Sequence, residues 1–441
     1  MLQAIVNALK IPELRRKILF TLGMLVLFRL IASIPLPNVD PTQMDQLFSN
    51  PNNPLAGIGN LLNLLSGGAL GQFSIAAMGV YPYITASIIM QLLIPLIPAL
   101  EELSKEGEQG RNKIQRYQYW LTVPLAYLQG YGQTLTINSQ VPLFGNFNFS
   151  ITQNFLPTFA ILTMMVAGTM LLVWMGELID ERGIGNGLSI IIFGGIVTAL
   201  PGIVFQTFTS ASGGGNVIGG ILLFVVTIVT VVGIVLITEG QRRIPVQYAR
   251  QVRGNKVYGG QSSHVPLKVN MAGMIPLIFA QSILIFPSTV ASYFWDSSPT
   301  ATGIGNAIAG FFVNRFSPTS LLYTIAMFFM VVLFTYFYAL VLFNQQDLPE
   351  SLQRNGGFIP GIRPGRNTAV YLTKVLNRIT LIGALFLGFI AASPYFVQQL
   401  TSLQIGFSST GLLIVVGVAV DTMRQLEAQM LMRNYEGFIS R

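Results

Sequence analysis

Long apolar runs separated by short polar segments make up most of the chain. A membrane-spanning helix needs about 20 mainly apolar residues, and ten charge-poor runs reach or approach that length. The runs lie near residues 18–34, 73–97, 119–136, 155–176, 188–207, 217–238, 270–293, 319–343, 375–392 and 407–420. The pattern therefore predicts an all-α polytopic membrane protein with ten transmembrane helices, of which the last two are only marginally long.

A shorter apolar stretch, from Leu55 to Leu70, stands directly before the second run. It is helix-like, but it contains Asn60, Asn63, Ser66 and four glycines, so it is too short and too broken to span. Irregular backbone at membrane depth persists only where it is buried in protein or lines a water-filled cavity. We therefore interpret this stretch as a re-entrant segment beside a cavity, and a cavity indicates a pathway.

The basic residues indicate the orientation. The chain has 25 Lys and Arg against 17 Asp and Glu, which gives a formal net charge of +8, and only 10% of its residues are charged. If the N-terminus is cytoplasmic and the loop before the ninth span is counted as 344–378, all Lys and Arg except Arg29 and Arg315 fall in segments on the cytoplasmic side. Because short cytoplasmic loops carry an excess of Lys and Arg, this distribution supports the count of ten and predicts that both termini are cytoplasmic.

Ten spans divide into two halves of five, which we expect at residues 1–210 and 211–441. An odd number of spans in each half means that the second half must be inverted relative to the first. Inverted repeats with a pathway at their interface recur in membrane transport. The two halves share no clear sequence identity, so this expectation rests on the count alone.

Two predicted cytoplasmic loops, 239–269 and 344–374, are much longer than a turn requires, and such loops are usually functional or disordered. Their charge alone leaves two interpretations open, namely a topology signal with lipid contact or a docking surface. The run Gly356–Gly365, in which Pro360 and Pro364 stiffen an arginine-bearing turn, favours a docking surface. The candidate docking residues are Arg242, Arg243, Arg250, Arg253, Lys256, Arg363 and Arg366.

The predicted span cores contain no Asp, Glu or His, although ion-coupled transport and intramembrane proteolysis usually keep such residues there. His264 lies in a basic loop and the chain has no cysteine, so no metal site is predicted. The glycine run around Gly185 lacks the preceding strand that a dinucleotide-binding motif requires. We therefore expect no enzyme activity and no cofactor, and any energy must come from a partner or from the membrane potential.

Arg29 lies inside the first predicted span and has two interpretations. It lines a pathway, or it pairs with a neighbouring group or extends to the interface. The second is favoured because such residues often serve packing pairs. Uncharged polar residues in spans, such as Thr85 and Gln281, are likewise usually helix–helix contacts.

Several motifs together resemble the SecY family of protein-conducting channels of bacteria, and the resemblance covers essentially the whole chain. One such motif would be a weak indication, but several long motifs in the right order are specific. The segments are Arg15–Phe20, Ile34–Pro37, Met78–Gln91, Lys105–Glu108, Glu181–Gly187, Gly240–Arg243, Leu267–Gly273 and Ile359–Gly365.

The resemblance implies an hourglass channel with two hinged halves, which passes unfolded preproteins across the membrane and releases transmembrane segments laterally into lipid. It places Arg363 where the family has the loop arginine that engages the motor. The implied pore ring consists of Ile84, Ile88, Leu188, Ile192, Ile278 and Ile414. The implied plug, residues 55–70, contains Leu55, Gly57, Ile58, Leu61, Leu62, Leu65, Gly67 and Leu70. The implied lateral gate, on spans 2 and 7, contains Thr85, Ser87, Gln91, Asn270, Gln281 and Ser282.

The physical chemistry of the implied pore ring suits a passive conduit. Ile84 and Ile88 are four residues apart and so share one helix face. A ring of aliphatic side chains offers a passing polypeptide no charge or hydrogen bond, and it blocks ions by excluding water. Isolated isoleucines in a span would normally be interpreted as packing residues. Because of the motif match, we interpret these isoleucines as members of the pore ring.

The partners that the resemblance implies are the small membrane subunits SecE and SecG, the ATPase SecA, the ribosome, signal peptides, nascent polypeptides and membrane lipid. The implied location is the bacterial plasma membrane. Three alternatives stay open at this point: a secondary transporter of a small solute, an intramembrane enzyme, and a scaffold without a pathway.

Overall fold

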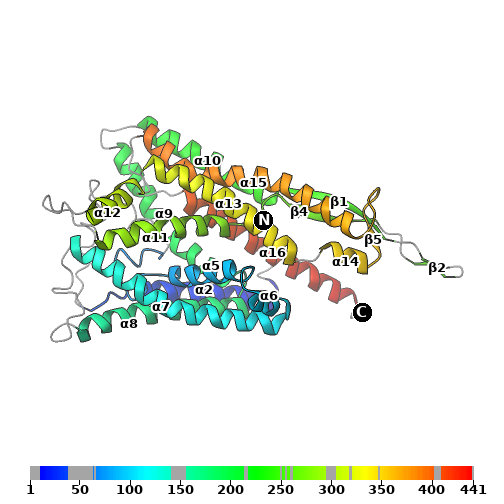
Figure 1. Cartoon of the computed structure of the whole chain (residues 1–441), viewed down its shortest axis with the longest axis horizontal. Coiled ribbons are helices and arrows are strands. Elements are labelled where there is room, and N and C mark those ends of the chain that lie inside the picture. The colour runs from blue at the N-terminus through cyan, green and yellow to red at the C-terminus, as the bar shows by residue number, and fades with distance from the viewer. Residues whose placement is uncertain are drawn as a thin grey trace.

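The computed structural model describes residues 10–37, 63, 66–140, 155–212, 217–248, 251–253, 256–258, 262–294, 304–316, 320–345, 348–401 and 409–439. This part of the chain is mostly helical, and the helices run along the long axis in two groups with a protruding arm at one end (Figure 1). The helices are α2 (Pro12–Ala32), α5 (Tyr81–Leu93), α6 (Pro98–Lys105), α7 (Glu108–Gln140), α8 (Phe155–Arg182), α9 (Gly187–Ser212), α10 (Val217–Glu239), α11 (Ile275–Phe294), α12 (Ile304–Arg315), α13 (Leu321–Gln345), α14 (Leu348–Arg354), α15 (Arg366–Thr401) and α16 (Ser409–Ile439).

Each of the ten predicted apolar runs contains a helix. Within the described residues, four helices are long and apolar enough to cross a membrane by themselves, namely those in 155–182, 219–239, 321–354 and 366–399, and the bent pair α5 and α6 makes a fifth. Helices α9 and α11 contain shorter apolar segments. The structure therefore confirms a polytopic, mainly helical membrane protein, while the number of ten spans stays a prediction.

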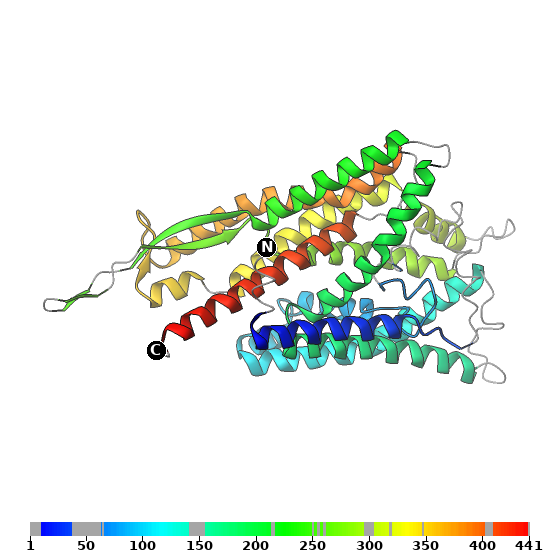
Figure 2. The same cartoon turned by 180° about the vertical axis from the view of Figure 1, so that it is seen from behind.

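The two groups of helices meet along a large shared core. Helices α2, α5, α7 and α8 form one group, and α10, α13 and α15 with α11 and α16 form the other (Figures 1 and 2). Helix α9 contacts both, because it packs on α2 and α8 as well as on α10 and α16. One buried apolar cluster takes residues from both groups, so the interface between them is closed by side chains.

The prediction of one continuous helix over residues 73–97 is wrong. Residues 66–80 form turns, in which Phe73 and Gly79 have positive φ angles of 43° and 57°. The backbone amides of Leu36 and Ile75 donate to the carbonyls of Phe73 and Ile34, which ties these turns to the end of α2. Helix α5 begins only at Tyr81, and α6 follows it at an angle of 101°.

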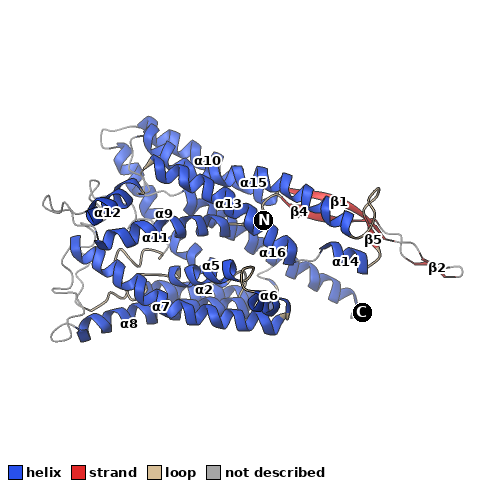
Figure 3. Cartoon of the chain, viewed as in Figure 1, coloured by secondary structure: helices blue, strands red, loops and turns tan. Residues whose placement is uncertain are grey.

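The chain is not all-α, because strands form in the two long loops that separate α10 from α11 and α13 from α15 (Figure 3). The strands are β1 (Gln241–Tyr248), β2 (Gln251–Arg253), β3 (Lys256–Tyr258), β4 (Ser262–Lys268) and β5 (Gly357–Phe358). Strand β1 pairs antiparallel with β4, with Gln241 opposite Lys268, and on its other edge with β5, with Tyr248 opposite Gly357. Burial of Ile244 and Val246 at alternate positions of β1 gives this sheet an apolar face.

The three-stranded sheet β4-β1-β5, together with α14 and the segment from β5 to the first turns of α15, forms a protruding unit that we call the arm. Residues from both loops build its core, which includes Ile244, Leu267, Leu352, Ile359 and Leu372. The arm and the end of α16 lie at one end of the molecule, and α12 lies at the opposite end (Figure 1).

Candidate functional site

The six residues of the implied pore ring come together from four helices. Ile84 and Ile88 lie on α5, Leu188 and Ile192 on α9, and the last two, Ile278 and Ile414, on α11 and α16. Four of them are buried in the core cluster shared by the two groups of helices, and Ile84 and Leu188 pack against it. This cluster is large, so its composition agrees with a closed constriction without singling out these six residues.

Leu188 has a second contact that the other ring candidates do not share in the described structure. A Cβ placed on Gly176 of α8 would lie 2.9 Å from Leu188 Cδ2, so the leucine packs directly on that glycine. Asp180 Oδ1 accepts a hydrogen bond of 2.7 Å from the Gly187 amide, which fixes the turn between α8 and α9. The start of α9 is therefore held firmly against α8.

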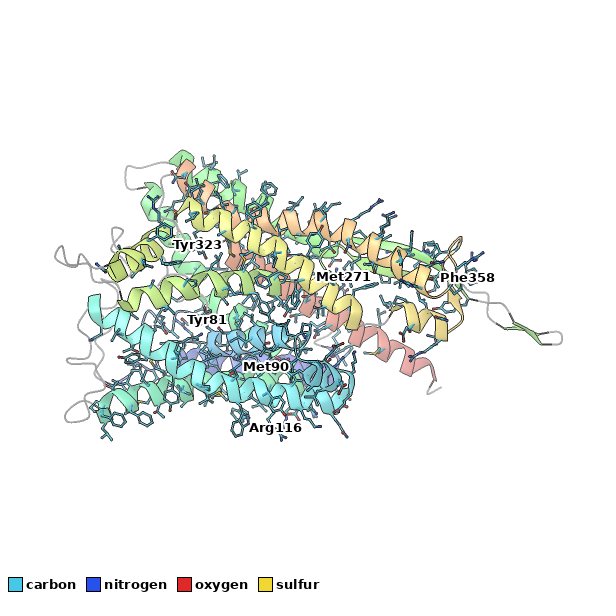
Figure 4. The ribbon with its side chains drawn as sticks, viewed as in Figure 1. Tyr81, Met90, Arg116, Met271, Tyr323 and Phe358 are labelled. Carbon is cyan, nitrogen blue, oxygen red and sulfur yellow. The ribbon has the colours of Figure 1, made fainter. Side chains whose placement is uncertain are left out.

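Helix α11 of the second group contacts both α5 and α7 of the first group, and we call its contact with α5 the seam. Tyr81, labelled in Figure 4, lies at the start of α5 and bridges the seam. The Tyr81 hydroxyl donates to the backbone oxygen of Ser282 over 3.1 Å. On the same helix, Thr85 Oγ1 donates to the Tyr81 carbonyl and accepts from Gln129 Nε2 of α7. Two predicted gate residues, Thr85 and Ser282, therefore meet here through Tyr81.

The other predicted gate residues bond locally. Gln91 Nε2 donates to Ser87 Oγ within α5, and Asn270 Nδ2 donates to the Gly273 carbonyl in the turn before α11. Gln281 and Ser282 are buried on α11. Four buried side-chain oxygens of this region have no hydrogen-bond partner within the described structure, namely Gln129 Oε1, Asn270 Oδ1, Gln281 Oε1 and Ser282 Oγ. Because an unpaired buried polar group costs about 1–3 kcal/mol, the seam is satisfied only in part.

Sequence reasoning missed Tyr81 and Gln129 as members of the seam. Tyr81 stands in the Val80–Tyr83 part of a motif that carried the resemblance, and Gln129 lies in the third apolar run. A hydroxyl or amide in a span is a usable signal, because buried polar groups seek partners.

Most of the implied plug lies outside the described residues, including Leu55, Gly57, Ile58, Leu61, Leu62 and Leu65. Its end is described, and residues 66–70 form turns instead of the expected helix. Gly67 and Gly68 have φ angles of 70° and 85°, which a regular helix does not permit. Gly67 and Leu70 are both buried, and Arg29 Nη1 donates to the Gly67 carbonyl over 3.0 Å. Arg29 thus has a partner within the chain, as its structural interpretation predicts.

The arm brings the two groups of docking candidates onto one unit. Arg242 and Arg243 are exposed on β1, and Arg363 and Arg366 are exposed just after β5. Arg253 and Lys256 lie in β2 and β3, which pair with each other, and Arg250 lies outside the described residues. The hydroxyl of Thr368 donates to the Arg363 carbonyl, which holds the arginine-bearing turn at the start of α15.

An ion pair joins the base of the arm to α16, the helix that carries Ile414. Arg424 bonds both carboxylate oxygens of Glu239 over 3.1 and 3.0 Å and also donates to the Thr238 carbonyl. One turn earlier, burial raises the pKa of the Asp421 carboxyl, although the nearby cations Lys268 and Arg424 oppose that shift. The arm is therefore connected to a helix of the central cluster.

With this geometry in place, the chain was compared with known proteins. The family model described as SecY matches residues 74–423. Relatives described as "Protein translocase subunit SecY" are 44% identical in Thermus thermophilus and 41% identical in Thermotoga maritima. In both cases the match covers 100% of this chain and 98% of the relative.

Solved structures show the same fold. A structure described as that of a protein conducting channel matches with a TM-score of 0.63 at 18% identity and covers 97% of both chains. A structure of Sec61 in a canine ribosome-channel complex matches with a TM-score of 0.61 at 17% identity, again over 97% of both chains. The chain belongs to the SecY family, and it is a protein-translocation channel, not a transporter of small solutes.

Proposed function

We propose that this channel passes unfolded preproteins outward across the bacterial plasma membrane and releases apolar segments into lipid between α5 and α11. One observation carries the proposal most directly: the two helices come from different groups, and the hydrogen bond from Tyr81 to the Ser282 carbonyl joins them. A seam held mainly by apolar packing separates without breaking a strong polar network. The buried oxygens of Gln281 and Ser282 would gain partners once water or a polypeptide entered.

The pore ring of this proposal consists of the six residues from Ile84 to Ile414 named above. Its support is that they converge from four helices on one apolar cluster. Aliphatic side chains exert only short-range contacts on a passing chain, so sequences of any composition would pass. The plug would lie at residues 55–70, and the turns at 71–80 would join it to the gate helix α5.

Energy comes from partners in this proposal, and the channel itself catalyses no reaction. Exposed Arg242, Arg243, Arg363 and Arg366 on the arm suit carboxylate or phosphate groups, because a guanidinium bonds such groups with two donors at once. The proposed partners are the ATPase SecA and the ribosome on the arm, and SecE and SecG as membrane subunits. Proteins similar in fold were solved with ribosomes, namely canine Sec61 and the yeast Ssh1 complex.

The proposed topology puts the arm and both termini in the cytoplasm. Its support is the excess of Lys and Arg in the loops assigned to that side, together with the position of the arm and of the end of α16 at one end of the molecule (Figure 2). The proposed hinged halves are residues 1–210 and 211–441, and α9, which packs on both groups of helices, would lie at their junction.

The test is translocation into vesicles. The purified chain is reconstituted with SecE, SecG and SecA, and an unfolded preprotein is added with ATP. The expected result is that the preprotein becomes resistant to external protease only in vesicles that contain the channel. Uptake of metabolites without preprotein, or no protected preprotein at all, would contradict the proposal.

A further inference from the structure

Gly67, at the end of the plug segment, is enclosed by two consecutive residues of α2. The guanidinium of Arg29 donates to its carbonyl over 3.0 Å, and a Cβ on Gly68 would come within 3.4 Å of the same Nη1 atom. Beside it, a Cβ on Gly67 would lie 2.8 Å from Phe28 Cζ, and Phe28 is buried. The turn thus has a charged donor on its carbonyl and an aromatic ring against its Cα.

A helix from farther along the chain closes the third side. A Cβ on Gly195 of α9 would lie 2.5 Å from the Cα of Gly67, and a Cβ on Gly67 would lie 2.7 Å from the Cα of Gly195. The two backbones therefore touch, which only glycine permits at both positions. Gly67 also has a φ angle of 70°, so a side chain there would be strained as well.

Hydrogen bonds within the turn connect Gly67 to the neighbouring residues. Asn63 Oδ1 accepts from the Gly71 amide over 2.7 Å, the Gly68 amide donates to the Asn63 carbonyl, and Ser66 Oγ accepts from the Leu70 amide. These bonds fold residues 66–71 back on Asn63. Where Gly67 is held, the end of the plug segment is therefore held with it.

Arg29 has a physical reason to be retained inside a span. A backbone carbonyl without a partner is costly at membrane depth, and an arginine is always charged, so its hydrogen bond is stronger than one from a neutral donor. A charged side chain within the membrane costs free energy, so such residues are usually retained only where they serve a function.

We propose that Arg29 and Gly195 are positioning residues that together hold the end of the plug in its resting place. Ile192 of the proposed pore ring lies one turn before Gly195 and so shares its face of α9. A polypeptide that displaces Ile192 would move Gly195 away from Gly67 and leave only the Arg29 bond and the Phe28 contact, both from α2, on the turn. Entry of substrate and release of the plug are thereby coupled through α9. This inference rests on the proposed function, because it assumes that residues 55–70 seal the channel.

The test measures ion leak through the idle channel. Arg29→Gln and Gly195→Ala are reconstituted with the membrane subunits in vesicles without preprotein or ATP, and halide efflux is recorded. Arg315→Gln, at the opposite end from the arm, and Gly202→Ala, where a Cβ would meet nothing within 4 Å, are the matched controls. Loss of one hydrogen bond from a charged donor raises the open population on the order of tenfold, so efflux should rise by about that factor in Arg29→Gln. In Gly195→Ala the new methyl group would overlap the Cα of Gly67, which should displace the turn and also raise efflux.

One additional variant separates loss of the charge from loss of the arginine itself. Arg29→Lys retains a cationic donor, so its efflux should stay close to that of the unchanged chain. Efflux of Arg29→Gln and Gly195→Ala at the level of their controls would overturn the inference. Preprotein translocation by the same vesicles is measured separately: normal translocation with unchanged efflux refutes the positioning role alone, whereas absent translocation in the unchanged chain refutes the proposed function.

Discussion

The seam between α5 and α11 and the arm are built in opposite ways. Across the seam, the Tyr81 hydroxyl donates to Ser282, and several buried oxygens nearby lack partners within the described residues. In the arm, β1 is paired on both edges, and its apolar face packs on a core from two loops. The two helices of the seam can therefore separate at a low cost in free energy, whereas the arm keeps one fixed conformation.

This contrast assigns different tasks to the two regions. A structure that opens and closes needs two states of similar free energy, and incomplete hydrogen bonding lowers the cost of leaving the closed state. A docking unit instead needs a fixed presentation of its charges, since preorganisation reduces the entropy lost on binding. The ion pair of Arg424 with Glu239 joins the end of α10, at the base of the arm, to α16, which contributes residues to the central cluster.

The largest expected effect is at the exposed arm. Arg363→Glu should reduce motor-driven translocation on the order of a hundredfold, because reversal of a charge in a docking contact replaces attraction by repulsion. Preprotein translocation into vesicles with SecA and ATP is the readout. The control is Arg315→Glu at the opposite end of the molecule, and the amount of folded, inserted protein should be equal in both. Normal translocation by Arg363→Glu would remove the arm from the docking surface.

The rigidity of the arm is tested in its core. Leu267 is fully buried there, so Leu267→Ala should destabilise the arm by about 2–5 kcal/mol while α5 and α11 keep their packing. Hydrogen exchange of β1 and β4 should accelerate, and exchange in the seam should not change. Ser263→Ala, at an exposed position of the same strand, is the control. Equal acceleration in seam and arm would show that the two regions form one cooperative unit.

The weakness of the seam is tested at its bridging hydroxyl. Tyr81→Phe removes one neutral hydrogen bond, worth about 0.5–1.5 kcal/mol, so the open fraction should rise about two- to tenfold. Because the chain has no cysteine, spin labels at Ile89→Cys and Ile283→Cys report this fraction by pulsed electron resonance. Tyr336→Phe, which loses an exposed bond to the Asn377 carbonyl, is the control. No change in the distance distribution would mean that apolar packing alone holds the seam.

The smallest effect concerns Asp421, where the arm meets α16. Burial raises the pKa of its carboxyl, so protonation is more favourable in the folded than in the unfolded state, and the resulting stabilisation is lost as pH rises through the folded pKa. Asp421→Asn mimics the protonated form. Its melting temperature should exceed that of the unchanged chain near neutral pH, and the difference should vanish below pH ~4. A variant that is less stable at neutral pH would show that the pairing with Lys268 and Arg424 outweighs burial.

Hydropathy predicted where the long helices lie, because burial in lipid demands continuous apolar runs. It did not predict the turns at 66–80, because these depend on distant partners: the strand-like pairing of Pro35 with Ser74 and the contact of Gly67 with Gly195. A hydropathy pattern predicts a helix for any long run without charges, because it contains no information on which glycines contact another part of the chain.

The strands of the arm were missed for a related reason. Strand β1 shows alternation only at Ile244 and Val246, and its partner β5 comes from the next long loop of the chain. The arginines of the arm were found because exposed charge is local information. The gate residues on spans 2 and 7 were named from the resemblance and stay a prediction, whereas the role of Tyr81 depends on which helix faces it.

The separation of α5 and α11 during transport tests the central claim most directly. The spin labels at Ile89→Cys and Ile283→Cys are measured in the idle channel and with a preprotein arrested during translocation. We expect a short distance in the idle channel and an increase on the order of 10 Å, the diameter of a helix, when an apolar segment of the preprotein lies at the seam. An unchanged distance in the arrested complex would contradict lateral release between these helices.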